Sequence, residues 1–426
     1  MSFIVDFHLH SRFSRSCSKK LTLPNNAAWA QIKGIDLLTT ADFTFPDWFK
    51  EIHEQLEESA DGIYKLKNKY ADQAEILVPE SCKRPVNFML TTEISLIYKK
   101  NDKCRKVHHV ILAPNIETAA KINHELDKRG NIKSDGRPIL GMDSKDLLRM
   151  LLDISEDIQL IPAHIWTPHF SILGSKSGFD TIEECFEELS DHICALETGL
   201  SSDPAMNWRL SQLDKYVLIS SSDAHSPQKF GREATIMDCK MTYPSILNTL
   251  RNDHKKVLGT IEFFPEEGKY HADGLRNEEL CLEPHETKKY NYRSPRTHKK
   301  ITVGVSHRVE DLADNPLGRK PKTAREVWHI IPLAEIISEI LDVGVQSKRV
   351  NNLYFEIINA LGSEFFILKD CPLEDIKKLH PQVAEAIKRM RQKNIIVKPG
   401  YDGEFGVIKC FNEKELAVSE KQTSLF

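Results

Sequence analysis

The sequence has few of the features that mark secreted or membrane-bound proteins. None of its apolar runs approaches the roughly 18 residues needed to span a bilayer, and its first residues lack the basic and apolar regions of a signal peptide. Its nine cysteines are scattered, and no two of them are spaced as CxxC. We therefore expect a cytoplasmic, nucleoid-associated protein with reduced thiols, rather than a disulfide framework or a thiolate zinc knuckle.

A large excess of charge of either sign is also lacking. The net charge is -4 over 426 residues, and 40% hydrophobic with 28% charged residues is typical of a globular protein. Because this length exceeds a usual single core, we expect one large domain and a smaller one. One segment departs from the balance: from Lys288 to Arg325 there are eleven Lys and Arg against three Asp and Glu. Such an excess favours a phosphate-binding surface.

The pair His8 and His10 is the first candidate for chemistry. It follows a short apolar run that is typical of a strand, and in a strand both imidazoles point to the same side. Two imidazoles on one face are able to share a metal ion. Two histidines near a terminus are nevertheless more often incidental than ligands, so the rest of the chain has to decide.

The segments that follow alternate between helical and strand patterns. A helix is expected over Leu23–Lys33, a strand over Ile35–Thr40, and a charged helical stretch over Asp47–Ala74. Such alternation predicts parallel strands joined by crossover helices, with reactive groups at the C-terminal ends of the strands.

Ligand-type residues recur where the predicted strands end. His108 and His109 are adjacent within one strand and face opposite ways, so at most one of them faces the barrel interior. Several buried carboxylates in one place require cations, and imidazole with carboxylate suits zinc, manganese or iron rather than calcium. Such ions activate water for phosphoester hydrolysis. The strand-end residues are Asp42, Glu93, His164, Glu197, Asp223 and His225.

These motifs resemble those of the polymerase and histidinol phosphatase (PHP) superfamily of metal-dependent phosphoesterases. The resemblance implies a distorted (β/α)7 barrel with two or three divalent ions (zinc, manganese or iron, with magnesium as a further option) and catalytic roles for Glu93, Asp223 and His225. In the superfamily a histidine often stands at the position of Asp42, and another where this chain has Ser14–Ser16. The implied ligands are His8, His10, Glu93 and Asp223 for one ion, Glu93, His108 and His164 for a second, and His225 with Asp42 for a third.

A closer resemblance, along nearly the whole chain, is to endonuclease Q. It rests on the segments 10–15, 91–95, 173–180, 197–204 and 399–406. It implies a DNA repair endonuclease that hydrolyses the phosphodiester 5′ of a deaminated base (uracil, hypoxanthine or xanthine) or of an abasic site. Two alternatives remain: a PHP phosphoesterase for a small phosphorylated molecule, and a non-catalytic DNA or clamp adaptor, which is expected to have lost ligands.

Several residues near the predicted metal ligands are candidates for DNA contacts. The stretch Gly174–Gly178 would form a nest of backbone N–H groups around a phosphate, or else a plain surface turn. Residues just after His164 would line a pocket for an extruded base, although Trp166 and Phe170 fit equally well as packing beneath the barrel rim. The candidates are Ser11, Arg12, Arg15, Trp166, His169, Ser175 and Lys176.

The composition changes after the predicted barrel, 1–262. Relatives of endonuclease Q carry a four-cysteine zinc module about here, but Ser294–Thr297 stands where a CPxC is expected, and Cys281 is the only cysteine nearby. We therefore predict a basic module, 263–322, without structural zinc. Its histidines, 271, 285, 298 and 307, fit a solvated surface better than a metal site without thiolates. Its predicted DNA contacts are Arg293, Arg296, Lys299 and Lys300.

The remaining chain divides into a helical domain, 323–411, and a flexible tail, 412–426. Apolar residues with a period near 3.6 predict helices from Thr323 to Lys393, and two short strands are expected over 395–397 and 405–408. The last five residues resemble the pentapeptide that binds the bacterial sliding clamp, either as a functional tether or by chance. The residues that would insert into the clamp are Gln422, Ser424, Leu425 and Phe426.

Overall fold

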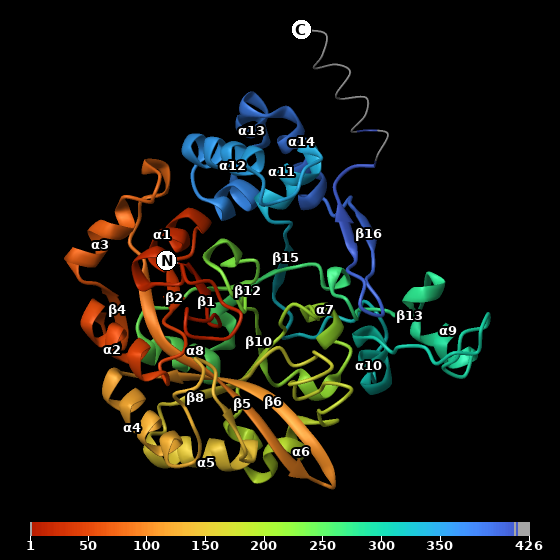
Figure 1. The fold of residues 1–426 in the computed structure, drawn as a ribbon, viewed down its shortest axis with the longest axis horizontal. Helices are drawn as coiled ribbons and strands as arrows, with labels where there is room; N and C mark the ends of the chain where they lie inside the picture. The colour runs from red at the N-terminus through yellow and green to blue at the C-terminus, as the bar shows by residue number, and fades with distance from the viewer. Residues whose placement is uncertain (1, 413–414, 416–426) are drawn as a thin grey trace.

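A distorted barrel forms the body of the protein, as the resemblance implied. The computed structural model describes residues 2–412 and 415 (Figure 1). Hydrogen bonds connect six strands in the order β11-β1-β2-β5-β6-β8, and a separate parallel pair, β9 and β10, completes the ring. Ile165 N donates to Glu197 O (3.1 Å), and Ser220 N donates to Thr235 Oγ1 (3.0 Å). The strands are β1 (Phe3–Asp6), β2 (Leu37–Thr39), β5 (Asn87–Lys100), β6 (Lys103–Ala113), β8 (Gln159–Pro162), β9 (Ala195–Glu197), β10 (Val217–Ile219) and β11 (Ala234–Met237).

The sheet is mixed rather than parallel throughout, which corrects the sequence-based expectation. Strands β1, β2 and β5 are parallel neighbours, whereas β1–β11, β5–β6 and β6–β8 are antiparallel. The long β5–β6 hairpin turns at Asn101 and Asp102, both in the left-handed backbone region (φ 52° and 56°). Two such residues make the tight turn that a two-residue hairpin favours, so no crossover helix is needed there.

The helix expected over Asp47–Ala74 is interrupted by a hairpin. The chain forms α2 (Pro46–Gln55), β3 (Leu56–Ala60), β4 (Ile63–Leu66) and α3 (Asn68–Glu75). In β4 the buried residues Ile63, Tyr64 and Leu66 are broken by exposed Lys65, and Tyr64 pairs with Phe88 of β5. Gly62, with φ +68°, supplies the turn. The many charged residues in this stretch mask the short run of apolar residues that forms the strand.

Helices cover the outside of the barrel, and α8 packs against one end of its interior. Tyr243, Ile246 and Leu250 of α8 join a buried cluster with Val5, Met89 and other inward-facing strand residues. The helix expected over Leu23–Lys33 forms as predicted and ends at Gly34 (φ 95°). The remaining elements here are α1 (Leu23–Lys33), α4 (Ile116–Asp127), β7 (Ile139–Leu140), α5 (Ser144–Ile154), α6 (Ile182–Phe186), α7 (Pro204–Asn207) and α8 (Tyr243–Arg251).

The basic module projects from the side of the barrel (Figure 1). It contains β13 (Asp273–Leu275), β14 (Leu280–Leu282), α9 (Pro284–Lys289) and α10 (Val305–Leu312), and follows β12 (Val257–Glu262). The helix expected from Thr323 does not start there, because β15 (Glu326–His329) instead pairs in parallel with β12. A side chain at Gly259 would collide with the Glu326 carbonyl, so this close strand pair needs glycine.

The C-terminal helices group over one end of the molecule (Figure 1). They are α11 (Leu333–Leu341), α12 (Lys348–Leu361), α13 (Leu373–Leu379) and α14 (Pro381–Arg391), followed by the hairpin β16 (Ile396–Lys398) and β17 (Val407–Lys409). Their buried apolar residues belong to the same core cluster as α1. Among the described residues, no helix combines the length and the apolar character needed to cross a membrane. The predicted clamp-binding residues Gln422, Ser424, Leu425 and Phe426 lie outside the described part of the chain.

Candidate metal centre

Glu93 lies at the middle of a group of imidazoles and carboxylates. It is buried in the interior of β5, which continues to Lys100, and not at a strand end as expected. One of its oxygens, Oε1, lies 2.6 Å from His108 Nδ1 and 3.4 Å from His164 Nε2. The other, Oε2, lies 3.3 Å from His10 Nε2 and 3.5 Å from His8 Nε2. One carboxylate therefore faces two sets of ligand atoms.

The ligand atoms fall into two groups that fit divalent cations. His8, His10 and Asp223 form one, and Glu93, His108 and His164 form the other, each with its ligand atoms within 4.8 Å of one another. The Nε2 atom of His8 is buried without a hydrogen-bond partner. Imidazole nitrogen and carboxylate oxygen are the ligands that zinc, manganese and iron accept. The donor set and the orphaned nitrogen therefore fit two neighbouring ions.

Glu197 orients two of these histidines. Its Oε2 lies 3.0 Å from His8 Nδ1 and accepts the backbone N–H of His164 at 2.8 Å. A carboxylate on one ring nitrogen fixes the imidazole and leaves the other nitrogen for a metal ion. From the sequence we predicted Glu197 at a strand end but gave it no role. That strand-end position was the one feature that could have identified it as part of the site.

Asp42 makes the corresponding contact with His10. Its Oδ1 lies 3.4 Å from His10 Nδ1, and its Oδ2 accepts hydrogen bonds from Ser11 N and Ser14 Oγ, both at 2.7 Å. A side chain at Gly136 would collide with this carboxylate, so glycine allows the 134–137 loop to approach it. Asp42 thus contacts a ligand histidine; its share in a third ion stays a prediction.

His225 marks the open side of the centre. Its ring centroid lies 4.6 Å from that of His10, and its Nδ1 donates to the Asp223 carbonyl at 2.9 Å. The side chains of His225 and Asp223 are 37% and 24% exposed, whereas Glu93 is fully covered. The group is therefore accessible from the edge that carries His225.

Arg137 compensates the central carboxylate and was missed in the sequence. Its Nη1 lies 3.1 Å from Glu93 Oε2. Burial alone would raise the pKa of Glu93, but His108, Arg137 and His8 hold that pKa well below its usual range. Burial lowers the pKa of His108 to about 4 despite the neighbouring Glu93. Arg137 lies in a loop without periodicity, so no local pattern marks it.

Several site residues adopt a left-handed backbone. The φ angles of His164, Asp42 and Asp223 are 29°, 43° and 46°. Such conformations cost free energy in residues other than glycine and cluster at functional sites. Gly199 belongs to the same arrangement, because a Cβ at this position would collide with the Cβ of His164.

The adjacent histidines 108 and 109 face opposite ways, as predicted. His108 points to Glu93, whereas His109 Nε2 lies 2.9 Å from Ser144 Oγ beneath the outer helices. Burial lowers the pKa of His109 to about 3. A neutral, hydrogen-bonded core histidine therefore neighbours a histidine of the candidate metal centre, and the strand alternation explains the difference.

Two of the predicted DNA contacts are buried, and a third is held in an ion pair. Ser11 is fully buried, with its backbone N–H on Asp42. Trp166 is also fully buried, and its Nε1 donates to Asn207 Oδ1 at 2.8 Å, so it packs beneath the rim and stacks on no base. Half-buried Arg12 pairs with Glu51 at 2.5 Å, and its DNA contact stays a prediction. Sequence proximity to a ligand does not decide which way a side chain points.

The predicted phosphate nest is a closed turn instead. Within Gly174–Gly178, the N–H groups of Gly174, Lys176 and Gly178 donate to the carbonyls of Ser171, Pro168 and Gly174. Groups satisfied in this way are not free to cradle a phosphate. The side chains of Ser175 and Lys176 are exposed, as are Arg15 and His169, and their DNA contacts stay predictions.

Hydrogen bonds organise the basic module around Glu278. Ser294 Oγ donates to Glu278 Oε2 at 2.5 Å, and Thr297 Oγ1 donates to Glu278 Oε1. Ser294 Oγ also accepts the backbone N–H groups of Arg296 and Thr297, at 3.0 and 3.3 Å. The segment that stands in place of a CPxC is thus held by a carboxylate. The four predicted DNA contacts, Arg293, Arg296, Lys299 and Lys300, are exposed around this turn.

The module's histidines do not gather into a ligand group among the described residues. His307 is fully buried, and its Nδ1 lies 2.5 Å from Asp273 Oδ2. Asp273 in turn accepts the backbone N–H of Gly304 at 2.7 Å. The prediction of a solvated surface was therefore wrong for His307, which forms a buried hydrogen bond with Asp273.

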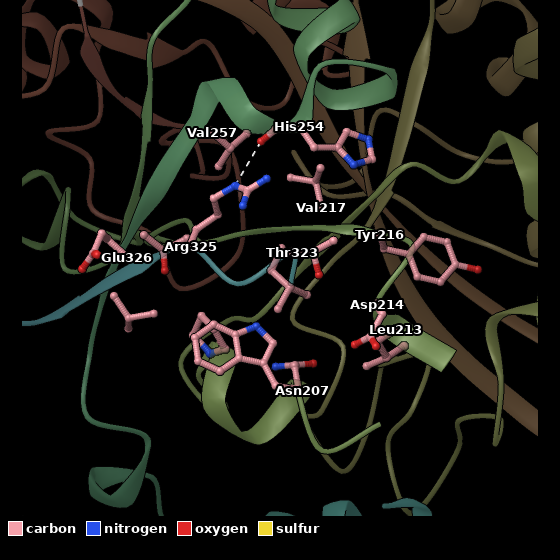
Figure 2. A pocket seen from close by; sticks show the side chains of 15 residues that line it. Asn207, Leu213, Asp214, Tyr216, Val217, His254, Val257, Thr323, Arg325 and Glu326 are labelled. Carbon is pink, nitrogen blue, oxygen red and sulfur yellow. Dashed lines mark hydrogen bonds between the residues drawn. The ribbon is translucent and has the colours of Figure 1, made fainter. Parts of the chain in front are cut away.

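A small pocket lies where β15 meets the barrel (Figure 2). Arg325, the last residue of the basic segment, borders it and donates from Nε to the His254 carbonyl at 3.3 Å. Its volume is about 40 Å³. Small-molecule sites usually enclose about 300 to 1,000 Å³, so this pocket is too small for a nucleotide.

Residues 332–394 match the family described as the MJ0043 C-terminal domain. The uncharacterized protein MJ0043 of Methanocaldococcus jannaschii is 32% identical over 257 residues, which cover 58% of this chain and 32% of that protein. The chain thus spans about a third of that relative. The uncharacterized protein YqxK of Bacillus subtilis is 28% identical over 405 residues, with 92% of this chain and 93% of YqxK covered.

Two solved structures superpose along nearly the whole chain. The lesion-specific endonuclease PfuEndoQ from Pyrococcus furiosus has a TM-score of 0.83 at 29% identity, with 96% of this chain and 95% of that chain covered. Endonuclease Q in complex with a 27-mer duplex carrying an abasic lesion at the active site has a TM-score of 0.82 at 29% identity, with 98% of both chains covered. The chain is therefore a structural relative of endonuclease Q, as its sequence motifs predicted.

Proposed function

We propose that this protein is a metal-dependent DNA repair endonuclease that cuts 5′ of a deaminated base or an abasic site. The observation that carries the proposal is the placement of Glu93 between two sets of metal-ligand atoms, in a chain that superposes along nearly its whole length on endonuclease Q. Uracil, hypoxanthine and xanthine are the deaminated bases we assign to it. The exposed edge at His225 and Asp223 supports access for a large substrate.

Two ions would be held by His8, His10, Asp223, His108 and His164, with Glu93 shared between them. Divalent ions bound there would polarise a phosphoryl oxygen and lower the pKa of a bound water. Glu197 and Asp42 keep His8 and His10 in the orientation that binding requires. Arg137 limits the repulsion among the buried carboxylates. His225 and Asp42 remain the proposed ligands of a third ion, and zinc, manganese or iron the proposed metals.

The DNA would lie across the open edge of the metal centre and reach the basic module. Arg293, Arg296, Lys299 and Lys300 are exposed there, and Arg296 and Lys299 lie near enough to Glu278 to lower the pKa of its carboxyl group. Cations of this kind bind phosphates without reading sequence. Lesion selection would then come from the base, because a damaged or mispaired base costs less to extrude from the duplex.

Labelled duplexes that carry uracil, hypoxanthine, an abasic site or no lesion test the proposal, with and without manganese. We expect manganese-dependent cleavage of the damaged strands only, and faster cleavage where the lesion is mispaired. Equal rates on damaged and undamaged duplexes would refute lesion selection. Hydrolysis of a small phosphomonoester without any cleavage of DNA would favour the small-molecule phosphoesterase instead.

We also propose the bacterial sliding clamp as a partner of the last five residues, 422–426. Burying a leucine or phenylalanine contributes about 1.5 to 3 kcal/mol each. Leu425→Ala with Phe426→Ala should therefore weaken clamp binding by at least about a hundredfold. Equal capture of a purified clamp by both proteins would show that the resemblance is chance.

A further inference from the structure

The loop of residues 167–179 follows the candidate ligand His164 and folds back onto its ring. Ser171 is fully buried, and its Oγ lies 3.2 Å from His164 Nδ1 and donates to the His164 carbonyl at 2.6 Å. Thr167 Oγ1 lies 3.2 Å from the same nitrogen and contacts Ser171 Oγ. Because these hydroxyls engage Nδ1, the other ring nitrogen, Nε2, faces Glu93 Oε1 at 3.4 Å. The loop therefore sets the ring orientation of one ligand of the second ion.

Hydrogen bonds tie the base of this loop to the segment that carries His164. Leu173 N donates to the Ile165 carbonyl at 2.9 Å. Phe179 N donates to the Ile172 carbonyl at 2.6 Å. Both donors belong to residues whose side chains are buried in the core. Leu173 and Phe179 thus close the base of the loop, and their own carbonyls face a third segment of the chain.

Arg308 of the basic module is the partner of these two carbonyls. Its Nε donates to the Leu173 carbonyl at 3.0 Å, and its Nη2 donates to the Phe179 carbonyl at 2.9 Å. The same Nη2 lies 2.6 Å from Asp180 Oδ1, just after the loop. A planar guanidinium binds several acceptors in a fixed geometry that a lysine does not reproduce. One side chain of the module therefore holds both sides of the base of the loop.

Helix α10 carries Arg308 on the side that packs against the barrel, where the side chain is only 17% exposed. Val305 and Val309, three residues before and one residue after Arg308, are buried in the core cluster that also contains the base of the loop. His307 points to the other side of the helix and bonds Asp273 within the module. Since residues three or four apart share a helix face, α10 is fixed to the barrel through one face and to the module through the other.

We infer that Arg308 is a positioning residue of the metal centre, which acts through the 167–179 loop to hold His164 for the second ion. The inference deepens the proposed nuclease function, because it rests on the metal centre of that proposal. It gives the basic module, 263–322, a second role. Besides binding phosphates, the module orients a ligand of the hydrolytic site.

The first ion should not depend on the module. Its histidines are oriented by carboxylates of the barrel: Glu197 Oε2 lies 3.0 Å from His8 Nδ1. Asp42 Oδ1 lies 3.4 Å from His10 Nδ1. A change at Arg308 should therefore weaken the binding of the second ion and leave the binding of the first one unchanged.

A matched pair of variants on α10 tests this difference. Arg308→Ala removes the bonds to the loop, whereas Glu310→Gln changes a separate contact of α10 with the barrel, the ion pair with Arg209 at 2.5 Å. Manganese binding to the metal-free protein is measured by calorimetric titration, without DNA. Arg308→Ala should weaken the second ion by about tenfold, as expected for residues that orient metal ligands. Glu310→Gln should change both ions by less than about twofold. His108→Ala removes a ligand of the second ion alone and so identifies its binding step.

Amide hydrogen exchange of the metal-free protein provides a second readout. Exchange in 172–179 should become faster in Arg308→Ala and stay unchanged in Glu310→Gln. Arg308→Lys keeps the charge without the planar fork and should fall between Arg308→Ala and the parent, which also provides the comparison if the alanine variant does not fold. In a Ser171→Ala background, where the hydroxyl on His164 is already gone, Arg308→Ala should weaken the second ion by less than about threefold.

A weaker second ion in Arg308→Ala, with binding by Glu310→Gln close to that of the parent, supports the inference. Losses of equal size in the two variants would assign the effect to general docking of the module and overturn it. Faster exchange of the loop with unchanged manganese affinity would also overturn it, because Arg308 would then be a structural contact only. A parent protein that binds two manganese ions but cuts no damaged duplex would refute the nuclease function, and the titration would still decide the role of Arg308.

Discussion

Two glutamates, Glu93 in the barrel and Glu278 in the basic module, each hold several segments of the chain together by different chemistry. Glu93 is fully buried and faces imidazole nitrogens and one guanidinium. Glu278 faces the hydroxyl donors of Ser294 and Thr297, which satisfy both of its oxygens. A carboxylate supplied with protein donors is complete without a metal ion, whereas one that shares its surroundings with other ligand atoms needs cations. The groups that surround a carboxylate, more than the carboxylate itself, therefore distinguish a metal site from a structural hydrogen-bonding site.

The largest expected difference between the two glutamates is in catalysis. Glu93→Gln removes a charge shared by both ligand groups and should reduce phosphodiester cleavage by more than about a thousandfold. This loss exceeds the 10- to 100-fold that is typical when a residue that hydrogen-bonds to a metal ligand is changed. Asp223→Asn should have the same consequence. Single-turnover rates on an abasic duplex provide the measurement, with circular dichroism as the control for folding.

Glu278→Gln is the matched substitution in the module. Cleavage at saturating enzyme should change by less than about threefold, because Glu278 touches no predicted metal ligand and surface changes of this kind usually have small effects. A loss of activity as large as that of Glu93→Gln would show that Glu278 is as important for cleavage as Glu93. Full activity of Glu93→Gln would end the metal-centre assignment.

A smaller loss is expected at Glu197. Glu197→Gln keeps the size of the side chain but weakens its hold on His8, so metal affinity or activity should fall by about 10- to 100-fold. The effect should appear mainly as a higher manganese concentration at half-maximal activity. An unchanged manganese dependence would show that His8 needs no carboxylate partner.

Chelation should distinguish the two sites directly. EDTA should abolish cleavage, whereas amide hydrogen exchange in 273–301 should not change, because hydrogen bonds to Glu278 hold that turn. Ser294→Ala leaves two backbone N–H groups without their acceptor and should destabilise the turn by about 1 to 3 kcal/mol. Faster exchange in the module after chelation would show that an ion supports it.

Glu233 and Glu262 are buried carboxyl groups of the barrel that should make its stability depend on pH. Burial raises the pKa of both Glu233 and Glu262 well above the usual range, and Ser220 Oγ lies 3.1 and 3.0 Å from the two carboxylates. Because the folded state then holds protons that the unfolded state releases, unfolding free energy should decrease as pH rises from the normal carboxyl range through these raised pKa values. Denaturant titrations of Glu262→Gln should show a weaker decrease. An equal decrease in Glu262→Gln and in the parent protein would show that other groups cause the pH dependence. Asp6 is one such group, because burial raises its pKa to about 6.

The smallest expected effect is on the salt dependence of DNA binding. Neutralising Arg293, Arg296, Lys299 and Lys300 should flatten the slope of log affinity against log salt by roughly one unit per lost phosphate contact. Anisotropy titrations between low and moderate salt measure this slope. An unchanged slope would place the DNA elsewhere.

The grouping of the candidate ligands could be predicted from residue type and strand pattern, since a period of two explains why His8 and His10 share a side and why His108 and His109 do not. The same pattern did not predict where β5 would end, so Glu93 was expected at a strand terminus and lies in the strand interior. Strand length depends on the partner β6, which pairs with it along eleven positions from Leu90 to Lys100. Partners distant in sequence are invisible to a local pattern.

By itself, the sequence determined the residue types of the ligand set, the position and bounds of α1, and the resemblance to endonuclease Q, because these depend on local periodicity and short motifs. Only the tertiary structure decided which groups surround the ligands. Arg137 reaches Glu93 from a loop 44 residues away, and Glu197 meets His8 across 189 residues. It also directed Trp166 into the core and left His225 at the open edge of the candidate metal centre. Orientation and access depend on packing between segments that are far apart in the chain, and no local stretch of sequence specifies that packing.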